Sequence, residues 1–294
     1  MTPLLPAATL ASAAASLHVS PRAGRALELI TRAIHAAGPD GFERAGLALD
    51  GSTALIGVYL AMGGERPVVL RALDTLEVAP VRAGADIDGF RAAIANALGA
   101  TIEGEMLVFP PLEGLDRNRL ETPRLPVRVA SSPLTFDPPA GTERQSGART
   151  GAITADGIRF RIHPTANPPA AVPTAYLEEL VYRLVLRLAV PAGSADAAAV
   201  DDFAWFVERD PVLALDIVGG PVRTALARSL AARGLNPTEA LPAIRGRILY
   251  ALRAGDRSLA AIPGWRLDGA PRPADRLAIE QAAIAALRPF EETR

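Results

Sequence analysis

The chain has 294 residues, a formal net charge of -1 and no cysteine, and all 31 of its basic residues are arginines because lysine is absent. The lack of cysteine excludes disulfides and thiolate-ligated metal sites, and the lack of lysine excludes Schiff-base chemistry and the lysine-containing phosphate loop. With so small a net charge, a polyanion could bind only to a local basic patch. Enrichment in Ala, Arg, Gly and Pro is typical of a GC-rich bacterial genome.

Residues 1–21 are rich in small side chains, but they lack the positive region of a signal peptide, and prolines interrupt their apolar run. We interpret them as an N-terminal tail or short helix. The longest apolar run, around 54–62, is too short to span a membrane. We therefore expect a cytoplasmic protein without a membrane span.

Residues 22–165 predict an α+β domain with an antiparallel sheet and flanking helices. Apolar residues recur at helical spacing from Arg22 to Ala37, and "AGPDG" ends this helix. The opposite, polar face of the helix contains Arg25, Glu28, Arg32 and His35. Over 47–78, the turn signals Asp50-Gly51 and Gly63-Gly64 stand between β-rich runs and predict a three-stranded antiparallel meander.

The next segment predicts a short helix over 86–98, with Asp86 as its N-terminal cap and Gly99 as its C-terminal stop. "EMLVFPP" (105–111) and "LPVRVA" (125–130) predict strands, and residues 131–147 are typical of a long loop. The order helix, meander, helix, strand over about 22–112 is similar to that of the small α/β chaperones of type III secretion. This similarity concerns the order of elements alone, and the C-terminal half departs from that family.

A hairpin is predicted at the end of this domain, with its turn at Asp156-Gly157. Strand alternation places Ile158, Phe160 and Ile162 on one face and Arg159, Arg161 and His163 on the other. Two guanidinium groups and an imidazole on one face could bind an anionic group. The alternative is that this face is the solvated side of an ordinary strand.

Residues 174–294 predict an all-helical domain, with helices near 175–190, 196–208, 211–218, 221–233, 238–253 and 273–288. Residues 174–218 contain eight acids and three arginines, whereas 219–266 contain eight arginines and two acids. The second block could present Arg245, Arg247, Arg253 and Arg257 to a partner or to nucleic acid. Pairing between the two blocks is the favoured alternative, because these arginines are spread around their helix.

No metal site or cofactor is predicted, since His18, His35 and His163 lack metal-ligand spacing and no glycine-rich dinucleotide loop or serine-nucleophile motif occurs. The chain is therefore interpreted as a bacterial cytoplasmic protein-interaction or adaptor protein with a protein partner. One alternative is an enzyme that binds an anionic small molecule through Arg159, Arg161 and His163. Nucleic-acid binding through 219–266 is a disfavoured alternative, and the oligomeric state is left open.

Overall fold

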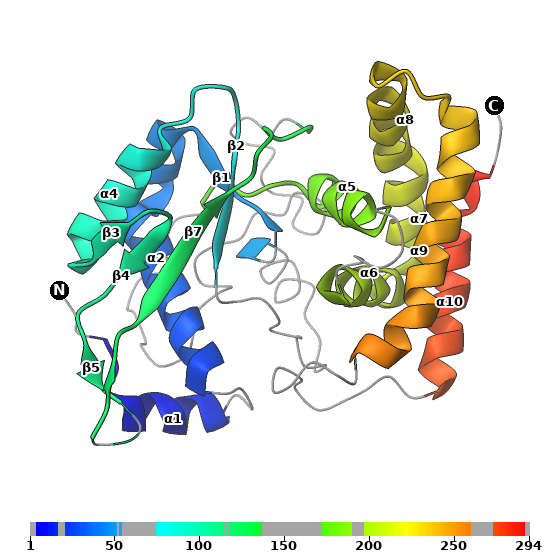
Figure 1. Ribbon diagram of the computed structural model, residues 1–294. Coiled ribbons are helices and arrows are strands. Elements are labelled where there is room, and N and C mark those ends of the chain that lie inside the picture. Colours follow the sequence, from blue (N-terminus) through cyan, green and yellow to red (C-terminus); the bar gives the residue numbers. More distant parts are fainter. Residues whose placement is uncertain are drawn as a thin grey trace. The chain divides into compact units, whose positions relative to one another are not determined.

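The computed structural model describes residues 4–16, 21–51, 53, 54, 75–114, 116, 118–136, 172–189, 197–259 and 273–291. The described residues form two compact units, and the chain passes from the first unit to the second between Leu177 and Glu178. The segment interpreted as a tail or short helix contains helix α1 (Ala7–Ser16). This helix belongs to the N-terminal unit and packs against helix α2 (Pro21–Ala45) (Figure 1).

The N-terminal unit is built around a five-stranded sheet with the strand order β1-β2-β7-β4-β3 (Figure 1). The strands are β1 (Leu47–Leu49), β2 (Leu76–Pro80), β3 (Thr101–Glu103), β4 (Met106–Val108) and β7 (Arg124–Val129). A separate two-stranded ladder joins β5 (Leu112–Glu113) to β6 (Leu120–Glu121). Strands β4 and β7 lie in the two segments predicted as strands, and the α+β class is confirmed.

One pairing in the sheet is parallel, although the sequence pattern predicts antiparallel hairpins. Leu76 of β2 lies opposite Val127 of the parallel strand β7, whereas Met106 of β4 lies opposite Pro126 in an antiparallel pair. After β2 the chain forms helix α4 (Ile87–Leu98) and the β3–β4 hairpin before it returns as β7 between β2 and β4. A parallel pair needs a long connection of this kind, and local alternation does not encode it.

The central strand β7 contains Pro126, a residue that cannot donate a hydrogen bond to a neighbouring strand. The next residue, Val127, donates its N–H to the Glu105 oxygen on the β4 side. Because successive N–H groups of a strand point to opposite sides, a donor at Pro126 would point towards β2. The paired part of β2 begins only at Leu76, opposite Val127, so the proline removes no bond from that ladder.

Helix α2 is interrupted where the sequence predicts its end, but a second helical segment follows. Gly38 has φ 60° and ψ 174°, and Pro39 opens a further stretch of helix that continues to Ala45. This stretch contributes Phe42, which is fully buried and lies edge-on to Phe90 of α4, with ring centroids 4.9 Å apart. This second segment of α2 therefore packs against α4 in the core of the unit through the contact between Phe42 and Phe90.

The predicted ends of α4 are both confirmed. The Asp86 carboxylate accepts the Gly89 N–H at 2.9 Å, and Gly99 adopts the left-handed conformation at φ 67°. The helix buries Phe90, Ile94 and Ala95. This helix was predictable because its caps and its core contacts are encoded within one short segment.

The turn predicted at Asp50-Gly51 is different in the structure. Residues 51, 53 and 54 are helical, and Ala54 donates its N–H to the Asp50 oxygen at 3.1 Å. Strand β1 pairs with β2, and on its other side Leu49 bridges to Thr174 in parallel. The middle strand of the expected meander falls at residues outside those described.

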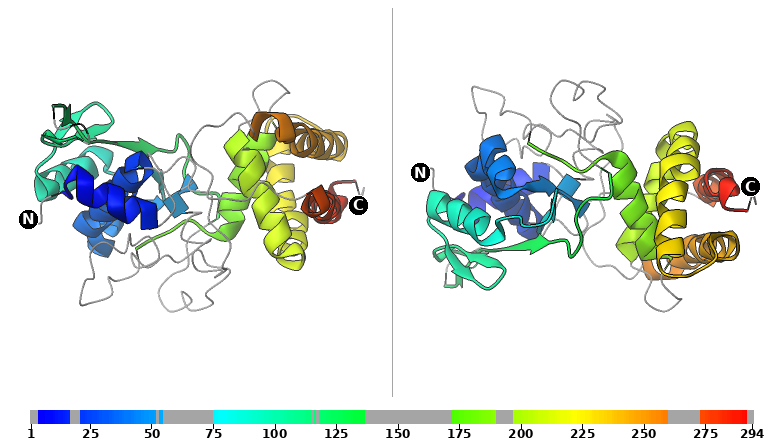
Figure 2. Two further views of the ribbon diagram at one scale, coloured as in Figure 1. Left: turned by 90° about the horizontal axis from the view of Figure 1, so that it is seen from below. Right: turned by 90° about the horizontal axis from the view of Figure 1, so that it is seen from above.

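The C-terminal unit is helical throughout its described residues, as the sequence predicts. Its helices are α5 (Leu177–Leu188, which starts at the unit boundary), α6 (Ala197–Arg209), α7 (Pro211–Ile217), α8 (Arg223–Ala232), α9 (Pro237–Leu259) and α10 (Pro273–Ala286). Helix α10 lies beside α6, α7 and α9 (Figure 1 and Figure 2). Phe203, Phe206, Ile248 and Leu287 are buried in the core of this bundle.

Between α7 and α8 the chain forms the π-helical segment Val218–Val222 rather than a helix break at its two glycines. Gly219 lies against the C-terminal segment, since a Cβ added there would stand 2.7 Å from the Pro289 Cγ. Pro289 is also held by the Arg223 Nε, which donates to its carbonyl oxygen at 2.8 Å. The first glycine therefore permits close packing against Pro289.

Replacing Gly219 with Ala should destabilise the C-terminal unit by about 1–3 kcal/mol relative to the Gly220→Ala control, because the new methyl group overpacks against Pro289. The control is well matched, since a Cβ at Gly220 meets no atom within 4 Å. Urea unfolding followed by circular dichroism would measure both variants. Equal stabilities would contradict the proposed role of the Gly219–Pro289 contact.

Candidate functional site

The predicted cationic row of Arg159, Arg161 and His163 lies outside the described residues. The same holds for the hairpin turn at Asp156-Gly157, for most of the predicted loop at 131–147 and for His18. His35 is exposed on α2, as expected for a surface histidine. Within the described part of the chain, no group of three or more His, Asp or Glu side chains is arranged to hold a metal ion.

The arginines of the basic block are not arranged as one free surface. Arg245 is half-buried, and its Nη1 lies 2.7 Å from the Glu291 carboxylate. Arg253 is exposed and forms an ion pair with Glu280, with its Nε donating at 2.7 Å. Arg247 is half-buried, and the Arg257 side chain lies outside the described part. Two of the four arginines therefore pair with carboxylates near the C-terminus.

Two acids of the acidic block 174–218 lie buried on helices of the C-terminal unit. Glu179 of α5 is buried and accepts the Arg183 Nε at 2.8 Å, one helical turn along. Asp202 of α6 is also buried. Ion pairs of this kind between turns of one helix stabilise the helix and need no ligand.

The first part of the polar face of α2, at Arg25 and Glu28, is buried, whereas His35 on the same face is exposed. Arg25 is 4% exposed and Glu28 is 3% exposed. The two side chains form an ion pair at 2.5 Å, and the Arg32 Nη2 lies 2.8 Å from the other Glu28 oxygen. The cause is the N-terminal segment, since α1 packs on α2 and Leu5 lies over this face.

Leu5 completes the hydrogen bonds of this buried cluster. Its N–H donates to the Glu28 Oε1 at 3.0 Å, and its carbonyl oxygen accepts the Arg25 Nη2 at 2.7 Å. The Arg25 Nε is also buried, but it makes no hydrogen bond and lies 3.5 Å from the Glu121 Oε1. A buried guanidinium is thus held in place at one end and has an unused donor at Nε.

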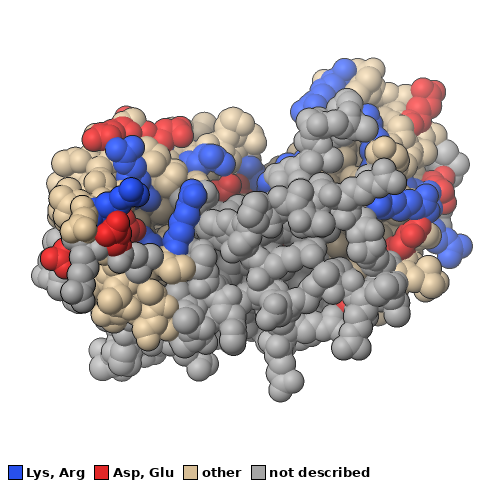
Figure 3. All heavy atoms as spheres, turned by 60° about the horizontal axis from the view of Figure 1, so that its bottom comes forward, with Lys and Arg blue, Asp and Glu red and all other residues tan. Residues whose placement is uncertain are grey.

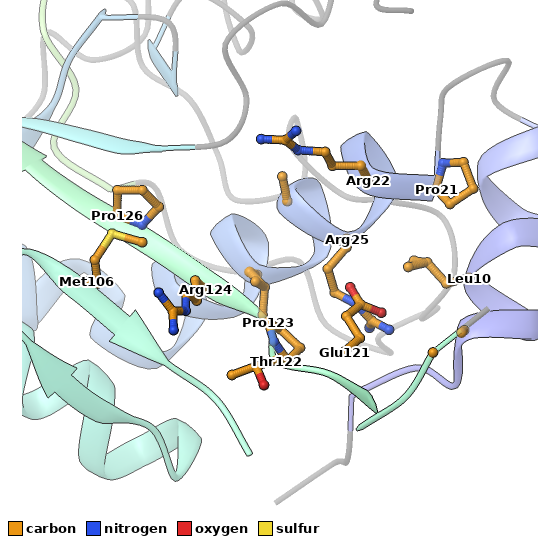
Figure 4. Close-up of a pocket in the computed structure, with 14 residues that line it drawn as sticks. Leu10, Pro21, Arg22, Arg25, Met106, Glu121, Thr122, Pro123, Arg124 and Pro126 are labelled. Carbon is orange, nitrogen blue, oxygen red and sulfur yellow. The ribbon is translucent and has the colours of Figure 1, made fainter. Parts of the chain in front are cut away.

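Arg25 lines a cavity of about 560 Å³ in the N-terminal unit (Figure 4). The cavity lies between α1 and the start of α2 on one side and β4, β7 and the segment before β7 on the other. Its apolar lining includes Leu10, Ala26, Leu29, Met106, Pro123 and Pro126. A cavity of this size falls in the range of small-molecule and peptide-side-chain sites.

Two further arginines line the same cavity. Arg22 precedes Arg25 by one helical turn on α2, and Arg124 is the first residue of β7. Both are exposed, and neither forms an ion pair with any residue that the structure describes. Figure 4 shows Arg25 directed towards Glu121, with Arg22 and Arg124 on different walls of the cavity. Among the described residues, the lining contains three arginines and one acid, Glu121, and is locally cationic.

The charge of this region is local and not a property of the whole chain, whose net charge is -1. The space-filling view shows arginine side chains gathered on the described surface of the N-terminal unit, with acidic side chains beside them (Figure 3). A local cationic group of this kind can attract an anion to one site. It gives no general affinity for polyanions.

This cavity was missed in the sequence because its residues come from segments about a hundred positions apart. One local signal could have indicated the buried arginine. Ala26, Leu29 and Ala33 are apolar in addition to the predicted stripe, so the apolar arc of α2 widens on one side until it adjoins Arg25. A helix with so wide an apolar arc is typically covered on more than one side.

No protein-family model, curated protein or solved structure matches this chain. Among the described residues, no helix combines the length and apolar character needed to cross a membrane.

Proposed function

We propose that this chain is a bacterial cytoplasmic protein-interaction or adaptor protein whose N-terminal unit binds an anionic group of its partner. The observation that carries this proposal is the cavity lined by Arg22, Arg25 and Arg124. The guanidinium group of arginine matches carboxylate and phosphate oxygens in shape and charge, and Arg22 and Arg124 are exposed in this lining.

The lining favours binding over catalysis. Among the residues that the structure describes, its polar side chains are those of the three arginines, Glu121 and Thr122, with no histidine or serine. A general base must lie within hydrogen-bond reach of the proton that it removes, and a nucleophile needs a base beside it. Because Glu121 is placed beside Arg25 and Thr122 has no base beside it in this lining, neither is arranged for such a step.

The test compares three forms of the intact chain in co-purification from the native host, with mass spectrometry of the bound proteins. The pocket variant Arg22→Ser with Arg124→Ser should lose its partner. The control variant Arg44→Ser with Arg82→Ser removes the same charge from exposed arginines outside the cavity lining, and it should keep the partner.

The expected loss is at least tenfold in recovered partner, because each lost arginine removes a charge-assisted contact to the anion. A partner that is recovered equally with all three forms would contradict the proposed role of the cavity. Recovery that falls equally in both variants would also contradict it, because the loss would then reflect net charge and not this site.

A further inference from the structure

We infer that the cavity receives a free carboxylate joined to an aliphatic group, as at the C-terminus of a partner protein that ends in a residue such as leucine. This inference rests on the proposed function and specifies the chemical group that is recognised. It draws on the fixed buried arginine, the two outer arginines, the apolar walls and the single acid of the cavity lining.

The guanidinium of Arg25 is positioned before any ligand arrives. The Glu28 carboxylate holds its Nη1, and the Leu5 carbonyl oxygen holds its Nη2 at 2.7 Å. The buried Nε makes no hydrogen bond, although its side chain lines the cavity. Since this side chain is already ordered, an anion that contacts it loses little affinity to ordering of the protein.

Arg22 and Arg124 add charge at the same cavity from two different elements (Figure 4). Because Glu28 neutralises Arg25, these two exposed arginines give the lining its positive character. An anion that enters between them is attracted from both walls. Two elements that converge on one space make a defined site, whereas one row of arginines on a strand or helix does not.

The apolar walls indicate that the anion is attached to an aliphatic group. Leu10, Leu29 and Met106 line the cavity together with Pro123 and Pro126. A volume of about 560 Å³ is far larger than a phosphate or sulfate ion needs. Burying an aliphatic group against these side chains adds affinity in proportion to the apolar area removed from water.

Glu121 favours a peptide carboxylate over a dianion or a simple fatty acid. Its carboxylate lies 3.5 Å from the Arg25 Nε, so any anion entering there meets a like charge, and this repulsion is larger for a doubly charged phosphate than for a single carboxylate. The same carboxylate can accept a hydrogen bond, and so can the Thr122 hydroxyl on the same wall. The last N–H of a peptide can donate to such an acceptor, whereas a fatty acid has no donor beside its carboxylate.

The experiment measures binding to the intact chain by isothermal titration in a buffer free of phosphate. The main probe is the peptide acetyl-Ala-Ala-Ala-Leu with a free carboxylate, compared with its C-terminal amide and with the same peptide ending in Ala. Octanoate and inorganic phosphate are titrated separately. We expect the free acid to bind at least tenfold more tightly than the amide, and several-fold more tightly than the peptide ending in Ala.

The protein variants locate the binding site. Arg22→Ser with Arg124→Ser should weaken binding of the free acid at least tenfold, whereas Arg44→Ser with Arg82→Ser should leave it unchanged. Both variants change exposed side chains, so their folding is expected to be retained, and circular dichroism would check this.

Three outcomes would overturn the inference: equal binding of acid and amide, phosphate binding as tightly as the free acid, or octanoate binding while the peptide does not. The co-purification result decides the proposed function separately. If the partner still depends on Arg22 and Arg124 but no free-acid peptide binds, the carboxylate assignment fails and the anion site stands. If the partner does not depend on these arginines, the proposed function fails as well.

Discussion

Replacing Glu28 with Gln should lower the free energy of unfolding of the N-terminal unit by about 3–5 kcal/mol, because it removes the nearest counter-ion of the charged and buried Arg25. The glutamine keeps the shape of the side chain, so packing changes little. It cannot supply the negative charge that lies within 2.8 Å of both Arg25 and Arg32. The amide group also replaces an oxygen that accepts from Arg25 or from Leu5.

Native-state hydrogen exchange of the intact chain is the suitable measurement, since it reports the two units separately. The slowest amides of the N-terminal sheet, such as Val127, should exchange faster in the Glu28→Gln variant. The matched control is Glu103→Gln on the exposed strand β3, which should change stability by less than about 0.5 kcal/mol. If the amides of the N-terminal sheet exchange at the same rates in the two variants, the buried Glu28 contributes no more to stability than a surface acid does.

Replacing Phe42 with Ala should destabilise the same unit by about 3–5 kcal/mol, because it removes a fully buried ring and leaves a cavity between α2 and α4. Leu120→Ala serves as a control, since this leucine is 72% exposed and its loss should have little effect. Hydrogen exchange of the α4 amides would measure the stability of the unit in both variants.

The contact between the two rings can be tested by a double-mutant cycle. Phe42→Ala combined with Phe90→Ala should cost less than the sum of the two single changes, by about 0.5–1.5 kcal/mol, because the rings pack edge to face. Strict additivity would show that the second helical segment of α2 does not stabilise α4 through this pair.

The helices of the C-terminal unit and the caps of α4 could be predicted because the residues that determine them are neighbours in sequence. Asp86 and Gly99 frame a helix of twelve residues, and a proline stands at the start of α10, where prolines are common in helices. Such signals do not depend on what packs against the element. They specify where an element begins and ends, and which side is apolar.

The candidate site could not be predicted in this way. The burial of Arg25 follows from the packing of α1 and Leu5, and the pairing of β2 with β7 follows from a return of the chain about fifty residues later. A polar residue on a helix looks the same in sequence whether water or another helix covers it. The same limit applies to Asp50-Gly51, where a turn signal precedes a helical segment.

The parallel contact between Leu49 and Thr174 has a consequence for the order of folding during synthesis. The Leu49 N–H donates to the Pro173 oxygen and the Ala175 N–H donates to the Leu49 oxygen, so this edge of the sheet is completed by residues made more than a hundred positions later. Pairings over such separations form slowly, whereas helical bundles rich in local contacts form fast. We therefore expect the N-terminal unit to finish folding only after the ribosome has released residue 175, when the first helix of the second unit is already being made.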